Sequence, residues 1–294
     1  MAGNQKPGED YVSSLMAYAD RKKSIVCLGA DPVLEKIPDN GKGTEERIAG
    51  FFSDIFTGIR ESQDPAHSIA SVKPNYAYFA QYGFEGLRAL KRVIDDAKKD
   101  WQVILDVKRG DIGASSAAYA KEAFEFWGAD AITVAPYMGH DSLSPFFEYC
   151  KRGKGVYVLV RTSNPGSADF QSLNAGDAGN PLFLEVAAKL ASWHENGVGA
   201  VVGATDIAEL EKVSDYFAGT GKHVPLLIPG VGAQGGSAGE AIAMLKKSGG
   251  RLAAMHRINS SSGITYCYLK KGSSDPAGAA LDEIGRLNSE IGKF

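Results

Sequence analysis

The regular alternation of short apolar runs with longer amphipathic stretches is the feature that most constrains the fold. Eight apolar runs have the length and residue types of strands. They cover residues 24–31, 68–75, 102–109, 131–136, 156–163, 200–205, 224–231 and 252–261. The stretches between and after them repeat apolar residues at helical spacing, over residues 46–59, 85–99, 116–127, 142–152, 181–196, 207–217, 239–247 and 276–293. Strands that alternate with helices predict a parallel sheet with helical crossovers.

Eight strand and helix units are the number that closes a (β/α)8 barrel, and 294 residues suit one such domain. We therefore expect an α/β protein: a single TIM-barrel domain over residues 1–294, with an extra N-terminal helix at 10–22. Near-continuous apolar strands fit a sheet that is buried on both faces. A doubly wound open sheet is the competing architecture, but no G-x-G-x-x-G sequence follows a strand to favour dinucleotide binding.

Composition narrows the class of protein. The chain has 32 basic and 35 acidic residues without a basic stripe, so nucleic acid is not an expected partner. No apolar run is long enough to cross a bilayer, and the polar first residues lack a signal-peptide pattern. Cys27, Cys150 and Cys267 are odd in number and far apart, which indicates reduced thiols and a cytoplasmic protein.

The third strand ends in an unusual concentration of charge. In the sequence ILDVKRGDIG, Asp106, Lys108, Arg109 and Asp111 follow a buried apolar segment. Side chains alternate along a strand, so Asp106 and Lys108 should face the barrel axis while Arg109 points away or leaves with the loop. A purely structural ion pair is the simpler explanation, but burying such a pair often gains less than apolar packing would.

Polar residues recur at the carboxyl ends of the other predicted strands, where barrel enzymes place their active sites. This rim includes Asp31, Lys73, Asp106, Lys108, Thr162, Ser163, Pro229, Gln234, Asn259, Ser260, Ser261 and Ser262. A single polar residue at a loop mouth usually has no function, whereas recurrence on one rim favours a site. The two carboxylates and two ammonium groups of Asp106, Asp111, Lys73 and Lys108 then suggest chemistry.

Asp106-x-Lys108-x-x-Asp111-Ile112 resembles the signature of the orotidine 5′-monophosphate decarboxylase family. Further blocks resemble that family in the same order: GADP (29–32), SVKPNYAYF (71–79), LDVKRGDIGAS (105–115), RTSNPGS (161–167), VVGAT (201–205), IPGVGAQGG (228–236) and INSSSGI (258–264). The RTSNPGS form and the length resemble the longer bacterial and archaeal branch. The short signature alone is weakly specific, but seven ordered blocks are highly specific.

The resemblance implies decarboxylation of orotidine 5′-monophosphate to uridine 5′-monophosphate, without metal or cofactor, in a homodimer. Lys108 would protonate C6 of the pyrimidine, and Asp106 would lie beside the departing carboxylate. The remaining implied positions are Lys73 and Asp31 at the ribose, Ser163 at the pyrimidine, Gln234 between base and phosphate, Pro229, Ser262 and Gly263 around the phosphate, and Asp111, Ile112 and Ser115 in a pocket shared with the other subunit.

This reaction fits the charges. Loss of carbon dioxide from C6 leaves a localised carbanion, which a fixed ammonium can stabilise and then protonate. A neighbouring carboxylate keeps the ammonium charged and aimed, so Asp106 supports Lys108. Contacts with the distant ribose and phosphate supply binding energy for closing the site.

One position departs from the family pattern: Ser262 stands where the family carries an arginine that grips the phosphate. A serine hydroxyl cannot provide the two parallel charge-assisted bonds of a guanidinium. The nucleotide could bind more weakly, another cation such as Arg257 or Arg161 could compensate, or Ser262 could be an engineered replacement, which the otherwise intact site favours.

Three other functions are open. A magnesium-dependent sugar-phosphate lyase of the same superfamily would need an acidic metal ligand where this chain has Lys73. A non-catalytic nucleotide-binding barrel is suggested only by Ser262, and a purely structural barrel leaves the polar rim unexplained. The histidines show no metal-ligand spacing. The Gly-, Asn- and Ser-rich segment 164–181 has the position of a lid over the site.

Overall fold

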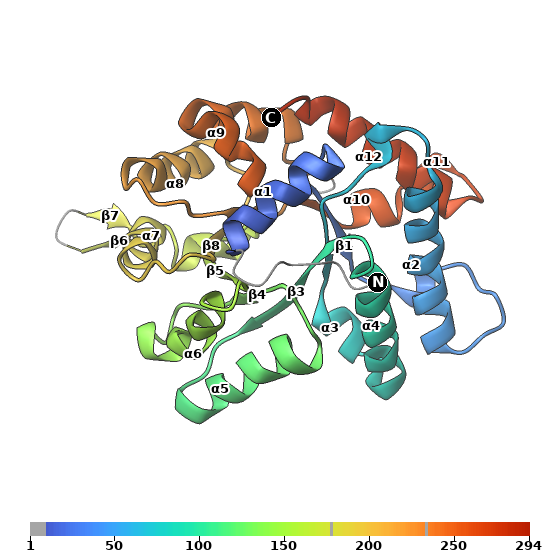
Figure 1. Cartoon of the computed structure of the whole chain (residues 1–294), viewed down its shortest axis with the longest axis horizontal. Coiled ribbons are helices and arrows are strands. Elements are labelled where there is room, and N and C mark those ends of the chain that lie inside the picture. The colour runs from blue at the N-terminus through green and yellow to red at the C-terminus, as the bar shows by residue number, and fades with distance from the viewer. Residues whose placement is uncertain (1–9, 177–178, 233–234) are drawn as a thin grey trace.

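The computed structural model describes residues 10–176, 179–232 and 235–294. Within these residues, eight parallel strands close into a barrel surrounded by helices (Figure 1). In chain order the barrel strands are β1 (Val26–Ala30), β2 (Ser71–Pro74), β3 (Gln102–Arg109), β4 (Ala131–Val134), β5 (Gly155–Arg161), β8 (Val198–Val202), β9 (Leu226–Ile228) and β10 (Arg257–Ser260). β1 pairs with both β2 and β10, which closes the sheet, so the predicted (β/α)8 barrel is confirmed and the open sheet is wrong.

The outer layer consists of helices that bury one face against the barrel. They are α2 (Thr44–Glu61), α4 (Gly83–Ala97), α5 (Gly113–Lys121), α6 (His140–Cys150), α7 (Leu182–Ser192), α8 (Ile207–Gly219), α9 (Ala238–Gly249) and α12 (Pro276–Ile291). In α2 the buried side chains include Ile48, Phe52, Ile55 and Phe56, at the spacing of one helix face. The same periodicity that predicts each helix therefore also indicates which face of the helix packs against the barrel.

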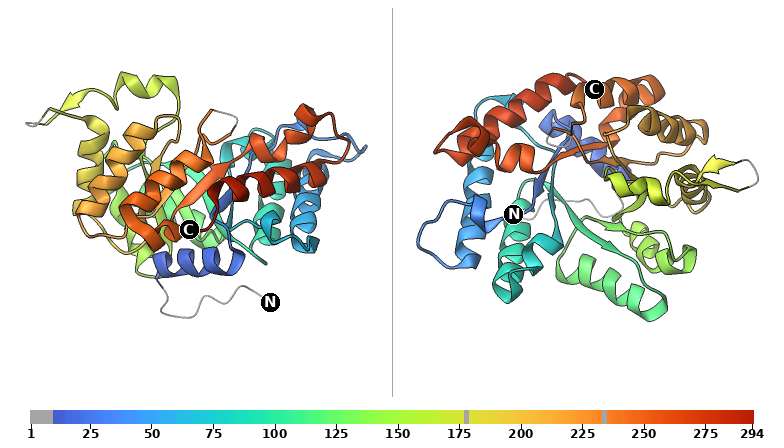
Figure 2. Two further views of the ribbon diagram at one scale, coloured as in Figure 1. Left: turned by 90° about the horizontal axis from the view of Figure 1, so that it is seen from above. Right: turned by 180° about the vertical axis from the view of Figure 1, so that it is seen from behind.

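Shorter elements fill the connections between strands and helices. These are α3 (Tyr76–Ala80), α10 (Ser262–Thr265), α11 (Cys267–Lys271), the 3-10 turns η1 (Leu34–Lys36), η2 (Pro65–His67), η4 (Pro165–Asp169) and η5 (Gly250–Met255), and the π-turn η3 (Glu122–Phe126). A small hairpin of β6 (Asn174–Ala175) and β7 (Asn180–Pro181) lies within the predicted lid segment and projects from the barrel (Figure 2).

Helix α1 (Tyr11–Lys22) closes the amino-terminal end of the barrel. It lies across the bottom of the molecule in the left view of Figure 2. Tyr11 and Leu15 pack into a buried cluster with barrel residues that include Ile104 and Tyr157. The hydroxyl of Tyr11 donates to that of Tyr157 over 3.3 Å. The extra N-terminal helix predicted at 10–22 is thus confirmed, and it leaves the opposite end of the barrel for a site.

The predicted eighth strand starts too early. Leu252 to Met255 belong to the turn η5, and the strand itself begins only at Arg257. The apolar residues of this segment pack beside α1 and α9 rather than entering the barrel ladder. An apolar run without alternation cannot distinguish a buried strand from a buried turn, which explains the error.

Two glycines at the carboxyl rim allow close approach of neighbouring segments. A Cβ on Gly29 would lie 1.8 Å from the Oγ of Ser261, and a Cβ on Gly203 would lie 2.9 Å from the Cβ of Ser163. Any larger residue would therefore push these rim serines outward. The backbone contacts at β1 and β8 explain why glycine stands in the GADP and VVGAT blocks.

Candidate active site

The end of β3 carries a bulge that is stabilised by Thr133 of β4. The register between the two strands shifts between Leu105 and Arg109. The Oγ1 atom of Thr133 accepts hydrogen bonds from the backbone N–H groups of Val107 (3.1 Å) and Lys108 (3.0 Å) and donates to Oδ1 of Asp106 (2.8 Å). Lys108 adopts a left-handed backbone with φ of 46°, which non-glycine residues rarely do. One buried hydroxyl thus provides an acceptor for the two N–H groups of the bulge and holds the backbone of Lys108 in place.

Asp106 lies between two ammonium groups. Nζ of Lys73 donates to Oδ2 of Asp106 over 2.7 Å, and Nζ of Lys108 donates to Oδ1 over 2.6 Å. Lys73 and Asp106 are 4% and 7% exposed, whereas the side chain of Lys108 is 49% exposed. The carboxylate and one ammonium are therefore buried in the barrel mouth, and the second ammonium faces the open side.

The pKa shifts follow from this arrangement. Burial alone would raise the pKa of Asp106, but Lys73 and Lys108 outweigh burial and hold that pKa well below its usual range. Burial would lower the pKa of Lys73, but Asp106 and Asp31 reverse the effect and raise it. In this Lys–Asp–Lys group, which we call the charge network, Asp106 and Lys73 are thus both ionised at neutral pH.

Arg109 leaves the network, as predicted from strand alternation. Its guanidinium donates to Glu122 at 3.1 Å and lies over the rings of Tyr76 and Tyr119. It therefore packs outside the barrel among α3, α5 and η3 and holds no position in the mouth.

A cavity of about 240 Å³ lies beside the charge network. It brings together residues at or after the ends of β1, β2, β9 and β10: Asp31, Val33, Lys36, Tyr78, Pro229, Gly230, Val231, Asn259, Ser261, Ser262 and Tyr266. Burial raises the pKa of Asp31 even though Lys73 and the hydroxyl of Ser261 oppose that rise. Oδ1 of Asp31 is buried and has no hydrogen-bond partner among the described residues, so this carboxylate can still accept a ligand hydroxyl.

Other predicted site residues lie around this group rather than in it. Asp111, Ile112 and Ser115 follow β3 on an exposed stretch, and Ile112 is 57% exposed. The carboxylate of Asp111 accepts from the backbone N–H of Ile112 (2.8 Å). Ser163 follows β5 against Gly203. Gly263 follows Ser262 in α10, and Gln234 lies outside the described residues.

Arg257 and Arg161, the two candidates for a cation that compensates for the family arginine, do not line the cavity. Arg257 is fully buried at the amino-terminal end of the barrel, where it donates to the carbonyl oxygen of Leu15 (2.8 Å) and to Gln102 (3.1 Å). Arg161 donates through Nε to Glu209 over 2.6 Å. Arg257 is in the strand that leads to Ser262, but its side chain turns into the amino-terminal end of the barrel, which we call the barrel floor. Arg161 is paired with Glu209 outside the barrel.

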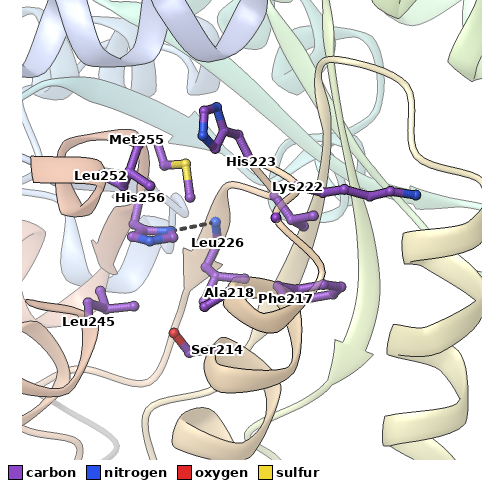
Figure 3. A pocket seen from close by; sticks show the side chains of 12 residues that line it. Ser214, Phe217, Ala218, Lys222, His223, Leu226, Leu245, Leu252, Met255 and His256 are labelled. Carbon is purple, nitrogen blue, oxygen red and sulfur yellow. Dashed lines mark hydrogen bonds between the residues drawn. The ribbon is translucent and has the colours of Figure 1, made fainter. Parts of the chain in front are cut away.

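A second cavity, of about 130 Å³, lies between α8, β9, α9 and η5. Figure 3 shows its mainly apolar wall, including Phe217, Leu245 and Met255, and the imidazole of His256, which accepts from the backbone N–H of Leu226 over 2.9 Å. None of the predicted site residues that the structure describes lines it. The charges of the rim therefore select the first cavity as the candidate active site.

Sequence reasoning missed Thr133 and Lys36. Thr133 is the one hydroxyl in the apolar run AITVAP, so a polar residue facing the barrel was the available signal. Lys36 stands among several charged residues of a connection, and nothing in the sequence distinguishes it from Lys42. Thr133 meets β3, and Lys36 lines the cavity, only in the folded barrel.

A closed parallel barrel with buried, paired charges at the carboxyl ends of its strands defines an enzyme of the (β/α)8 class. Residues 62–266 match the model of the orotidine 5′-phosphate decarboxylase / HUMPS family. The chain belongs to this family.

Similar proteins extend the match over nearly the whole chain. An orotidine 5′-phosphate decarboxylase of Verminephrobacter eiseniae is 41% identical over 285 residues, which cover 95% of this chain and 97% of that protein. The structure of OMP decarboxylase from Leishmania donovani aligns with a TM-score of 0.73 at 33% identity and covers 96% of this chain and 99% of that one. The structure of a putative orotidine 5′-phosphate decarboxylase from Streptomyces avermitilis aligns with a TM-score of 0.77 at 27% identity and covers 99% of this chain and 98% of that one.

Residues 10–176, 179–232 and 235–294 contain no group of three His, Cys, Asp or Glu side chains that could hold a metal ion. Among the same residues, no helix is long and apolar enough to span a membrane.

Proposed function

We propose that this protein decarboxylates orotidine 5′-monophosphate to uridine 5′-monophosphate, the step that forms uridine 5′-monophosphate in de novo pyrimidine synthesis, and that it works in the cytoplasm. The observation that carries the proposal is the ammonium of Lys108, held 2.6 Å from Asp106 at the mouth of the barrel. The names of relatives that match most of the chain give the substrate.

Lys108 has the two properties that the reaction requires. Its ammonium is a fixed positive charge where a carbanion at C6 of the pyrimidine would form, and it carries the proton that ends the reaction. When carbon dioxide leaves, the electron pair of the broken bond stays on C6 and takes a proton from Nζ of Lys108. Because Thr133 and Asp106 hold Lys108 before substrate arrives, little reorganisation is needed during the step.

The remaining residues bind the nucleotide in this scheme. The substrate carboxylate lies next to Asp106, and Lys73 and Asp31 form hydrogen bonds with ribose hydroxyls. Ser163 contacts the pyrimidine, Gln234 joins base and phosphate, and the backbone around Pro229 and the Ser262–Gly263 pair surrounds the phosphate. No metal or organic cofactor takes part. The segment 164–181 closes over the bound nucleotide as a lid and excludes water.

A homodimer completes the site in the same proposal. Asp111 and Ile112 of one subunit reach the active site of the other, where Asp111 meets the ribose and Ser115 lines the shared pocket. The side chain of Ile112 is exposed at the rim and is therefore accessible to a second subunit, as this arrangement requires.

The magnesium-dependent lyase is less well supported. Asp106 already accepts from two ammonium groups, and the buried ammonium of Lys73 repels a divalent cation from that carboxylate. A non-catalytic nucleotide-binding barrel would share the cavity but would not need an ionised Lys108 beside Asp106. Turnover separates these functions.

The test follows the loss of orotidine 5′-monophosphate absorbance with and without a chelator. We expect turnover that chelator does not change, and a Lys108→Ala variant that still binds uridine 5′-monophosphate but loses at least about 10⁴-fold in kcat, since both charge and proton are removed. Lys212→Ala, at an exposed position of α8, is the matched control and should keep full activity. Turnover that survives Lys108→Ala would disprove the mechanism, and turnover lost to chelator would favour the lyase.

A further inference from the structure

The cavity beside the charge network has a single basic side chain on its wall. Among its lining residues, all of which the structure describes, Lys36 is the one lysine or arginine. Lys73 and Lys108 are already paired with Asp106. A phosphate monoester bound at the Ser262 side would therefore meet one cation, and that cation is Lys36. We propose that Lys36 binds the 5′-phosphate of the nucleotide and so sets the preference for phosphorylated ligands, an inference that rests on the proposed function.

The backbone that carries Lys36 is held at several points. Arg47 donates through one guanidinium nitrogen to the carbonyl oxygens of Leu34 (3.1 Å) and Ile37 (2.7 Å), one at the first residue of η1 and one just after it. The hydroxyl of Tyr268 donates to the carbonyl oxygen of Lys36 itself. A lysine on an anchored turn loses less conformational entropy on binding than one on a mobile loop.

Tyr266 provides a surface for the ammonium. Nζ of Lys36 lies 5.4 Å from the centre of the Tyr266 ring, within the range of a cation–π contact. That ring is fixed, because its hydroxyl donates to the carbonyl oxygen of Asp31 (2.9 Å) and accepts from the N–H of Val33 (2.8 Å). Among the described residues Lys36 forms no ion pair with a carboxylate. Its charge is thus positioned beside the cavity and remains available to an anion.

Charge balance supports the same assignment. Asp31 lines the cavity, and its Oδ1, which has no partner among the described residues, suits a hydroxyl and repels a phosphate. Ser262 lines the same cavity and adds only a neutral hydroxyl. The ligand's ribose then lies toward Asp31, and its dianion lies toward Lys36 and Ser262. An ammonium is a compact point charge, so it replaces the charge of a guanidinium without its two parallel bonds.

The experiment compares nucleotide with nucleoside in wild type, Lys36→Ala and Lys36→Arg. Steady-state kinetics use orotidine 5′-monophosphate, and calorimetric titrations use uridine 5′-monophosphate and uridine. Lys42→Ala removes the same charge from the same connection at a residue that does not line the cavity, and it controls for net charge. For Lys36→Ala we expect KM and the Kd of uridine 5′-monophosphate to rise about 10- to 100-fold, or about 1.4–2.8 kcal/mol.

The further readouts separate a phosphate contact from a structural role. Uridine affinity should stay within about threefold in every variant, Lys36→Arg should retain nucleotide affinity, and Ser262→Arg in the Lys36→Ala background should restore it, because either change returns a cation to the cavity. Equal losses for uridine and uridine 5′-monophosphate, or an unchanged Kd in Lys36→Ala, would overturn the inference. The titrations need no turnover, so a protein that binds the nucleotide through Lys36 without decarboxylating it would refute only the proposed function.

Discussion

Replacing Thr133 by valine should impair both stability and catalysis, because one hydroxyl supports the bulge that presents Lys108. Valine has nearly the same shape, so the substitution removes three hydrogen bonds without creating a cavity. The bond to the charged Asp106 is worth about 1.5–3 kcal/mol, and each N–H left without an acceptor costs about 1 kcal/mol or more. We expect the free energy of unfolding to fall by about 3–5 kcal/mol.

The catalytic effect has a separate origin. Without the Thr133 acceptor, the backbone of Lys108 can leave its left-handed conformation, and the ammonium moves relative to the substrate. A displacement of about 1 Å lowers kcat on the order of 100-fold. KM should change little, because Thr133 lines no part of the nucleotide cavity.

Urea unfolding and steady-state decarboxylation measure the two effects. Thr133→Ser is the matched control, since it keeps the hydroxyl and loses only a methyl group, and it should stay within about 1.5 kcal/mol and about threefold of wild type. A Thr133→Val enzyme with wild-type kcat would refute the assigned role of the hydroxyl. If kcat and stability fell equally in Thr133→Ser and Thr133→Val, packing of the side chain and not its hydroxyl would be responsible.

Two further predictions concern the subunit interface and the second cavity. Mixing inactive Lys108→Ala with inactive Asp111→Ala should recover up to about a quarter of wild-type activity if sites are shared across a twofold dimer, and no recovery would place Asp111 in its own subunit's site. Burial and Arg257 lower the pKa of His256 to about 3, so the unfolded chain binds more protons below pH 6.5 and stability falls as the pH falls. The control is His256→Asn, which keeps an acceptor for the N–H of Leu226. Between pH 6.5 and pH 5, the free energy of unfolding of the wild type should fall by about 1.5–2 kcal/mol more than that of His256→Asn. If urea unfolding gives the same pH dependence for both proteins, this linkage is excluded.

Periodicity predicted the fold well because barrel strands and helices each bury a continuous apolar surface. The rim of polar residues was likewise predictable, since parallel strands end on the same side, and Lys73, Asp106 and Lys108 do meet there. The limits of sequence reasoning lie in contacts between elements. The position of Arg257 in the chain indicates nothing about a side chain that turns into the barrel floor.

The same limit applies to the residues that complete the site. The support that Thr133 gives to Lys108 depends on the register of two strands, which short apolar runs leave unspecified. Lys36 reaches the cavity on a turn that is held by Arg47 and by Tyr268, the latter more than two hundred residues later in the chain. Spacing along a sequence carries no information about such long-range closures.

The floor of the barrel has a consequence for synthesis on the ribosome. Among the described residues Arg257 is buried without a carboxylate partner. Its two terminal guanidinium nitrogens donate to the carbonyl oxygens of Leu15, Ala254 and His256 and to Gln102, while its Nε has no hydrogen-bond partner there. Leu15 emerges early in translation, whereas Arg257 emerges some 240 residues afterwards. The contacts of α1 with Gln102 and Tyr157 can form earlier, but its contact with Arg257 cannot form until the last eighth of the chain is being made, so the base of the barrel is completed late in synthesis.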